Sequence, residues 1–219
     1  MTNFSGQFIN LFAALVLLLA FAMLSQRRVL TLINLFALQG LVLATSTALV
    51  AWSSNQHHLY YSAALTLVLK VLFLPWLLHR LIRKLNVKWD VETLINIPTT
   101  MLIGIALVVF AFNLAGPISE MGGTINKSTL GIAIASVLLS FMMMITRSKA
   151  VPQVIGFLAM ENGLFFAAIT ATYGMPMVVE LGVALDVLVG MFIIGIFFFQ
   201  IRATFDSLEL KHMENLRED

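Results

Sequence analysis

The chain has 219 residues, of which 60% are hydrophobic and 11% are charged, and its formal net charge is +2. Because soluble domains carry about 25% charged residues, this composition excludes an ordinary soluble protein and indicates a polytopic membrane protein. The absence of cysteine excludes disulfides, thiol chemistry and iron–sulfur ligation by this chain.

Seven hydrophobic runs follow one another along the chain, and each is long enough to cross a bilayer. We predict an all-α fold in which seven transmembrane helices form a single domain, residues 1–202, followed by a cytoplasmic tail, residues 203–219. No basic segment precedes the first run and no small-residue cleavage site follows it, so we predict a retained span rather than a signal peptide. The segment from Gly116 to Lys127 is predicted to be a loop. The predicted spans cover residues 8–24, 29–52, 59–81, 94–114, 128–145, 151–171 and 178–200.

The placement of the basic residues supports this count of spans. With the N-terminus outside, Lys127 is the one basic residue on the outer side, and Lys70 lies inside the third run. The positive-inside rule places the side that is richer in Lys and Arg in the cytoplasm. We therefore expect a multi-pass protein of the bacterial inner (plasma) membrane with its C-terminus in the cytoplasm. The eleven residues on the cytoplasmic side are Arg27, Arg28, Arg80, Arg83, Lys84, Lys88, Arg147, Lys149, Arg202, Lys211 and Arg217.

Three of the hydrophobic runs carry an ionisable residue far from either end. These are Lys70 in the third run, Glu161 in the sixth and Asp186 in the seventh. A charged residue at the centre of a transmembrane helix costs about 2.5–3.5 kcal/mol on insertion scales, and it normally faces a protein interior or a water-filled path. We therefore take Glu161, Asp186 and Lys70 as candidate proton-relay residues. The alternative is structural, with Lys70 as a buried counter-charge to Glu161 or Asp186.

Other residues in these runs are expected to support the site. Gln39 and Asn34 lie in the second run, where interhelical hydrogen bonds are their expected role. Asn162 follows Glu161 directly, and Gly163 allows the backbone of a neighbouring helix to approach closely. Glu180 lies near the outer end of the seventh run, where it either supports the site or is solvated. Pro75 lacks a backbone donor and is expected to kink the third helix near Lys70.

Motifs for other chemistry are missing from the sequence. The four histidines, His57, His58, His79 and His212, are too scattered to suggest a zinc site. No pattern for phosphate binding, dinucleotide binding or a nucleophilic triad is present. We therefore expect no metal, no cofactor and no catalytic residue in this chain, and no nucleic-acid partner. The chemistry left to it is the handling of protons or ions.

Spans one to three and five to seven share a plan, which predicts a parallel three-helix internal repeat. In each triplet the first span ends on basic residues and the second carries a polar residue midway. A shift of about 122 residues lays Gln39 on Glu161 and, approximately, Lys70 on Asp186. The fourth span is a spacer that restores the orientation. Because these polar residues lie at similar depths, we expect protons or charge to move laterally between neighbouring helices or subunits.

Two segments in the second triplet carry a resemblance to a known family. They are QVIGFLAMENG, from Gln153 to Gly163, and VELGVALD, from Val179 to Asp186. Together they resemble the hydrogenase-4 component E family, whose members are membrane-arm subunits of formate hydrogenlyase-type and other group 4 nickel–iron hydrogenase complexes. The likeness covers most of the chain. The second triplet is also similar to the three-helix K-type subunit of respiratory complex I and the C-type subunit of multi-subunit cation/proton antiporters.

This resemblance implies a non-catalytic, ion-translocating subunit of an energy-converting complex. It implies that Glu161 matches the glutamate in the middle helix of the complex I subunit, and that Asp186 stands approximately at its second acid. In the first triplet, Gln39 and Lys70 replace the carboxylates. The nickel–iron centre and the iron–sulfur clusters would lie in other subunits, with antiporter-like membrane subunits as neighbours. The alternatives are a structural subunit of the same membrane arm and a subunit of a cation/proton antiporter.

Overall fold

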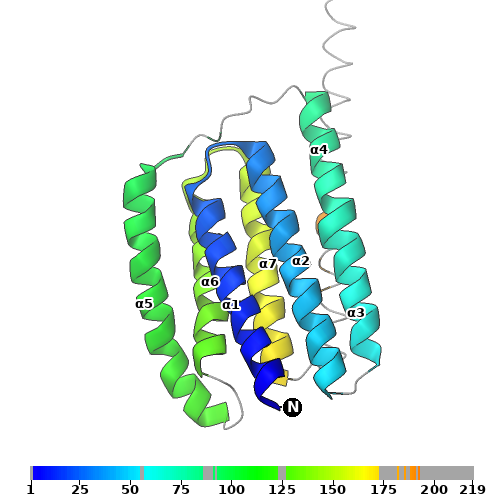
Figure 1. The fold of residues 1–219 in the computed structure, drawn as a ribbon. Coiled ribbons are helices and arrows are strands. Elements are labelled where there is room, and N and C mark those ends of the chain that lie inside the picture. Colours follow the sequence, from blue (N-terminus) through cyan, green and yellow to red (C-terminus); the bar gives the residue numbers. More distant parts are fainter. Residues whose placement is uncertain are drawn as a thin grey trace, which may run out of the picture.

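The computed structural model describes residues 2–54, 57–85, 91, 93–122 and 127–172, together with positions 182, 185, 188–190 and 192. These residues form mainly helices (Figure 1). In chain order the helices are α1 (Thr2–Ser25), α2 (Val29–Ser54), α3 (His58–Thr66), the π-helix η1 (Leu67–Phe73), α4 (Leu74–Leu85), α5 (Ile97–Gly122), α6 (Lys127–Thr146) and α7 (Ala150–Thr172).

Six helical stretches in the described residues are long and apolar enough to cross a membrane. They agree with the first six predicted runs, so the all-helical fold fits a polytopic membrane protein. The predicted seventh run, residues 178–200, lies largely outside the described residues, and the tail, residues 203–219, lies wholly outside them. The stretches are Gly6–Ser25, Val29–Trp52, Leu59–Arg83, Ile97–Glu120, Lys127–Thr146 and Ala150–Ile169.

Several hydroxyl side chains inside these helices bond to the backbone of their own helix. Thr47 Oγ1 donates to the Leu43 carbonyl oxygen at 2.8 Å, and Ser136 Oγ donates to the Ile132 carbonyl oxygen at 2.9 Å. In a bilayer core no water is present to satisfy a polar group, and a bond to the carbonyl one turn back removes this problem for Ser and Thr. Hydroxyl residues bonded in this way are therefore compatible with the apolar surroundings of the helices.

The helices form two antiparallel pairs, α1–α2 and α6–α7, that pack side by side (Figure 1). Helix α1 contacts α6, and α2 contacts α7, so the two pairs make one four-helix core. Phe36, Leu139, Ile155 and Leu158 are fully buried within it. Helix α5 packs on α6 and α1, and the continuous rod of α3, η1 and α4 packs on α2. In this arrangement α2 lies between α1 and η1, and η1 lies near α7.

One end of the core carries the α1–α2 and α6–α7 turns, and we call it the basic end because Arg27, Arg28 and Arg147 lie there (Figure 1). The segment before α5 joins both turns. The Val91 amide donates to the Arg27 carbonyl oxygen at 2.7 Å, and the Leu94 amide donates to the Thr146 carbonyl oxygen at 2.9 Å. An isolated antiparallel bridge pairs Thr93 with Arg147. The connection into α5 therefore ties the two helix pairs together at this end.

Helix α5 departs from the predicted boundaries at both ends. It continues through Pro117 to Gly122, so the prediction of a loop from Gly116 was wrong for this part. Proline loses the backbone bond to the residue four positions earlier but keeps a helical φ. Ser119 Oγ donates to the Gly116 carbonyl oxygen at 2.8 Å, which supplies a local side-chain bond beside the proline. At the other end, α5 begins at Ile97 rather than residue 94, because Thr93 and Leu94 pair with the α6–α7 turn instead.

The irregularity expected from Pro75 takes the form of a π-helical segment. Residues Leu67–Phe73 form η1, and the Leu74 amide donates to the carbonyl oxygen of Leu69, five residues back. Pro75 has no N–H to donate to the Val71 carbonyl oxygen, so an ordinary α-helical bond is lost there. The widened turn before it accommodates that loss. π-Helical segments of this kind are frequent at functional sites, and Lys70 lies at the centre of this one.

Candidate functional site

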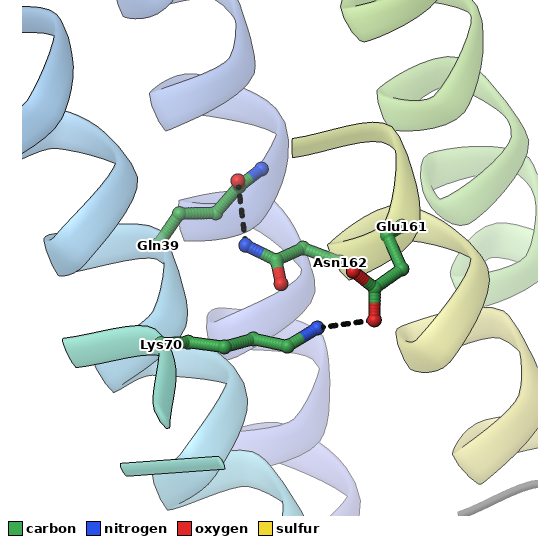
Figure 2. A network of polar contacts seen from close by, with 4 residues as sticks. All are labelled: Gln39, Lys70, Glu161 and Asn162. Atoms are coloured by element: carbon green, nitrogen blue, oxygen red, sulfur yellow. Dashed lines mark hydrogen bonds and ion pairs between the residues drawn. The ribbon is translucent and has the colours of Figure 1, made fainter. Parts of the chain in front are cut away.

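Lys70 and Glu161 form a buried ion pair between η1 and α7. Lys70 Nζ lies 2.9 Å from Glu161 Oε1, and the two side chains are 2% and 5% exposed. Figure 2 shows the lysine reaching across from η1 to the carboxylate on α7. Of the two partners considered for Lys70 from the sequence, the structure shows Glu161.

A second polar contact lies beside this ion pair. Asn162 Nδ2 donates to Gln39 Oε1 at 3.1 Å, which joins α7 to α2 (Figure 2). Gln39 is 0% exposed and Asn162 is 1% exposed. We call Gln39, Lys70, Glu161 and Asn162 the polar cluster. It lies where α2, η1 and α7 meet. Two consecutive residues of α7 make its bonds: Glu161 pairs with Lys70 of η1, and Asn162 donates to Gln39 of α2.

Small residues hold the backbones close around the polar cluster. A Cβ at Gly163 would lie 2.9 Å from Val137 Cγ2 and 3.1 Å from the Val137 backbone nitrogen, so α7 approaches α6 closely at this point. A Cβ at Gly40 would lie 3.1 Å from Lys70 Cβ. The absence of a side chain at these two positions lets α6 and η1 come near their neighbours. The closeness predicted for Gly163 is confirmed.

Buried aromatic side chains also lie beside the ion pair. Lys70 Nζ lies 5.5 Å from the centroid of the Phe165 ring, a distance at which a cation is attracted to the ring face. Phe165 and Phe166 are buried beside it, one turn along α7 from Glu161. Opposite charges at 2.9 Å reduce the penalty of placing each ion in this medium, although a buried pair is weak evidence for stability by itself.

The geometry permits proton exchange within the cluster. Lys70 Nζ donates directly to Glu161 Oε1, so a proton can pass between an ammonium and a carboxylate along an existing hydrogen bond. The pair has no net charge before or after that transfer. Groups of three or more metal-ligating side chains do not occur among the described residues.

The remaining predicted residues are placed differently. Asp186 and Glu180 lie outside the described residues. Asn34 is exposed on the surface of α2, whereas Gln39, five residues further on, has the interhelical bond expected of it. The residues that are brought together are therefore Gln39, Lys70, Glu161 and Asn162.

Arg147 is a buried residue that the sequence argument counted only as a loop cation. It is 1% exposed, and its Nη2 donates to the Leu24 carbonyl oxygen at 2.6 Å and to the Met23 carbonyl oxygen at 3.4 Å. Gln153 Nε2 donates to the Arg147 carbonyl oxygen at 2.8 Å. A signal was available in its position directly after an apolar helix, where an arginine side chain can bond the free carbonyls of a neighbouring helix end.

Among the described residues, helix ends rather than an acidic side chain balance the charge of Arg147. Its guanidinium bonds the last turn of α1, and its backbone directly follows the last residue of α6. The C-terminus of a helix carries about half a negative charge, so two such ends together balance about one cation. Burial lowers the pKa of the Arg147 guanidinium below its usual value, but arginine keeps its charge in proteins.

Comparison with known proteins gives relatives that extend along nearly all of the chain. No protein-family model and no solved structure matches it. It is 21% identical over 209 residues to the hydrogenase-4 component E of Escherichia coli K12, covering 95% of this chain and 97% of that protein. It is 32% identical over 220 residues to the uncharacterized protein Rv0085 of Mycobacterium tuberculosis, covering 100% of both. The chain therefore belongs to the same family as Rv0085, and the hydrogenase-4 component E proteins are its distant homologues.

Proposed function

We propose that this chain is a non-catalytic membrane subunit of a hydrogenase-related, energy-converting complex and takes part in proton or ion translocation through its buried charges. Two findings support the proposal. The similarity to hydrogenase-4 component E covers nearly all of both chains, and the described residues contain six helices of membrane-spanning type. In such a complex the hydrogen chemistry belongs to other subunits, and this chain works within the bilayer.

The Lys70–Glu161 ion pair carries the functional part of the proposal. Both residues lie near the middle of their membrane-spanning stretches, Leu59–Arg83 and Ala150–Ile169. Ionisable residues at this depth are rare, and they mark proton relays and ion paths. The bond between them crosses from one helix to another at a single depth, so it favours lateral exchange of a proton. Asp186 is the proposed next acid of the relay.

A parallel internal repeat is part of this proposal. Polar contacts between the two helix pairs join positions with similar separations in the sequence. The Asn162–Gln39 and Arg147–Leu24 contacts are each separated by 123 residues, and the Thr129–Asn10 contact is separated by 119. Both pairs thus lie at the same depth and in the same orientation, as a shift of about 122 residues requires. In the proposed repeat, α1 and α2 correspond to α6 and α7.

The proposal includes an orientation and partners. We place the basic end in the cytoplasm of a bacterial inner membrane, because Arg27, Arg28, Arg80 and Arg83 belong to connections or helix ends on that side. Antiporter-like membrane subunits are the proposed neighbours. They would contact exposed apolar faces, such as that of α5, where Leu102, Ile105 and Val109 are each more than half exposed.

A structural role for the polar cluster is the second candidate. The 2.9 Å ion pair and the 3.1 Å amide contact join α7 to both η1 and α2, so these bonds could serve only to fix how the helices dock. In that case the charges matter for assembly, and an apolar pair of similar size should replace them without loss.

Glu161→Gln in the assembled complex separates the two candidates. The amide keeps the shape and a hydrogen-bonding oxygen but cannot take up a proton. We expect assembly to persist and proton uptake per hydrogen turned over, measured in inverted vesicles, to fall by about tenfold or more. The matched control is Glu120→Gln, because Glu120 is an exposed glutamate near the end of α5. Full coupled transport in assembled Glu161→Gln complexes would rule out the relay.

The structural candidate predicts the opposite pattern. Glu161→Gln would fail to assemble, and the double variant Lys70→Met/Glu161→Met would restore both assembly and transport. Recovery of assembly without transport in that double variant would instead support the relay, because the docking surface would be intact while the titratable groups were gone.

A further inference from the structure

A row of buried hydroxyl residues continues from the polar cluster toward the end of the bundle opposite the basic end. Ser62, Thr66 and Lys70 are four residues apart along α3 and η1, and they are 4%, 3% and 2% exposed. Residues four apart lie on one face of a helix. The face that carries Lys70 therefore presents Thr66 and Ser62 in succession, the latter about 12 Å from Lys70 along the helix axis.

Helix α2 supplies a matching hydroxyl. Ser46 is seven residues from Gln39, which is close to two helical turns, so both lie on the same face of α2. Gly40 and Lys70 lie at the same depth because they are in contact. Helix α2 runs antiparallel to α3 and η1, so six residues forward from Gly40 to Ser46 correspond to about six residues backward from Lys70. The depth of Ser46 therefore falls between those of Ser62 and Thr66. Ser46 is 1% exposed.

Several polar atoms on this row have no hydrogen-bond partner in the described part of the chain. They are Ser46 Oγ and Ser62 Oγ, with Gln39 Nε2 and Asn162 Oδ1 at the polar cluster. An unpartnered buried polar atom destabilises a protein by about 1–3 kcal/mol. Serine usually avoids this in a membrane helix by bonding its own backbone, as Ser136 does here. Ser46 and Ser62 do not, so their hydroxyls are available to another partner of hydrogen-bonding size.

An apolar layer separates this row from the end of the bundle. Val50, Leu59 and Ile169 are 4%, 0% and 1% exposed and belong to one hydrophobic cluster with contributions from α2, α3 and α7. Leu59 lies one turn beyond Ser62 along α3. A constriction of apolar side chains next to a polar row is the arrangement by which membrane pores close to water and open when the layer is wetted.

We propose that Ser46, Ser62 and Thr66 form a water-bearing access path to the Lys70–Glu161 pair from the end opposite the basic end, closed by the layer of Val50, Leu59 and Ile169. This inference deepens the proposed function and rests on it, because it assigns the side from which the ion pair exchanges protons. Water bound between the hydroxyls accepts a proton from one neighbour and donates one to the next. The transferred proton ends on the Glu161 carboxylate, and no other bond is made or broken.

Thiol accessibility tests the path without measuring transport. The chain has no cysteine, so Ser62→Cys introduces its one thiol with little change in size. The variant is made in the complete complex, and a membrane-impermeant trimethylammonium methanethiosulfonate is added from the side opposite the basic end. The unreacted thiol of this chain is then counted by a maleimide mass tag. Ala63→Cys is the matched control, because Ala63 is 7% exposed at the same depth on another face.

We expect Ser62→Cys to react roughly tenfold faster than Ala63→Cys, because a thiol must reach water to ionise and react. Adding Leu59→Ala, which opens the apolar layer, should raise the rate at Ser62→Cys and leave Ala63→Cys unchanged. Equal rates at the two positions, or no reaction at Ser62→Cys even with Leu59→Ala, would overturn the path. If Ser62→Cys does not react while Glu161→Gln loses coupled transport, the path is refuted and the relay is not. If Ser62→Cys reacts while Glu161→Gln keeps normal coupled transport, the relay is refuted and the path is not.

Discussion

Lys70 Nζ and Glu161 Oε1 are 2.9 Å apart although 91 residues separate them in the sequence. Each comes from a hydrophobic stretch in which it is the one charged residue near the middle. Each charge is costly to bury there without a partner, and their contact joins the rod of α3, η1 and α4 to the four-helix core. The pair is therefore both a costly pair of buried charges and a place where two parts of the described fold meet.

Removing one member of this pair should be worse than removing both. We expect Lys70→Met to lower the stability of the purified protein by about 3–5 kcal/mol, because it leaves a carboxylate buried without its cation. The double variant Lys70→Met/Glu161→Met should recover most of that loss. Thermal unfolding in one detergent, with both variants and the parent measured together, provides the comparison. Equal losses in the single and double variants would contradict the expectation.

Gly163→Ala should push α7 away from α6. The new methyl group would lie 3.1 Å from the Val137 backbone nitrogen, and a backbone atom in a helix cannot move aside alone. Overpacking of this kind destabilises by about 1–3 kcal/mol, and it should be visible as a lower midpoint of thermal unfolding. Gly6→Ala is the control, because nothing lies within 4 Å of a Cβ at Gly6. A Gly163→Ala protein as stable as Gly6→Ala would show that the two helices are less closely packed.

Arg147→Ala should destabilise the basic end, whereas Arg28→Ala should not. The first variant removes the donor to the Leu24 and Met23 carbonyl oxygens, and hydrogen bonds to charged groups contribute about 1.5–3 kcal/mol. Arg28 is exposed in the neighbouring turn, so its loss should change stability by no more than about 0.5 kcal/mol. Arg147→Lys keeps the charge but lacks the planar fork and should fall between the two. Hydrogen exchange of the α1 C-terminus would locate the effect, and similar losses for both alanine variants would refute it.

The Gln39–Asn162 contact should appear as a coupling in a double-mutant cycle. We expect Gln39→Ala and Asn162→Ala each to destabilise the protein, and the double variant to be less destabilised than the sum of the two. A coupling of about 0.5–1.5 kcal/mol is normal for one neutral hydrogen bond. Additive effects would mean that the 3.1 Å contact contributes nothing to stability.

An affinity-tagged chain purified from its own membranes should bring hydrogenase-related subunits with it. The expectation rests on similarity to hydrogenase-4 component E over 95% of this chain. Mass spectrometry of the native complex is the measurement, with an unrelated tagged membrane protein from the same cells as the control. Recovery of the chain alone, or with antiporter subunits and without a hydrogenase large subunit, would count against the proposed complex.

Hydrophobicity and charge placement were sufficient to predict six of the spans, because the bilayer imposes length and composition on each helix separately. The same reasoning identified Gln39, Lys70, Glu161 and Gly163, since a polar or small residue in an apolar run has few roles open to it. It could not choose the partner of Lys70, because the partner depends on which helices pack together. The inward direction of Arg147 was missed for a related reason: a basic residue at a helix end satisfies the positive-inside pattern whether it faces water or the carbonyls of another helix.

The bonds of Arg147 also set an order for biogenesis. When the α1–α2 pair leaves the ribosome, the Arg147 side chain that bonds the Leu24 carbonyl oxygen has not yet been synthesised, because it lies 123 residues later in the chain. At a synthesis rate of about 5–20 residues per second, this interval is on the order of ten seconds. The first helix pair must therefore persist in the membrane in a partly assembled state, and it is locked in place only when the α6–α7 turn has been made.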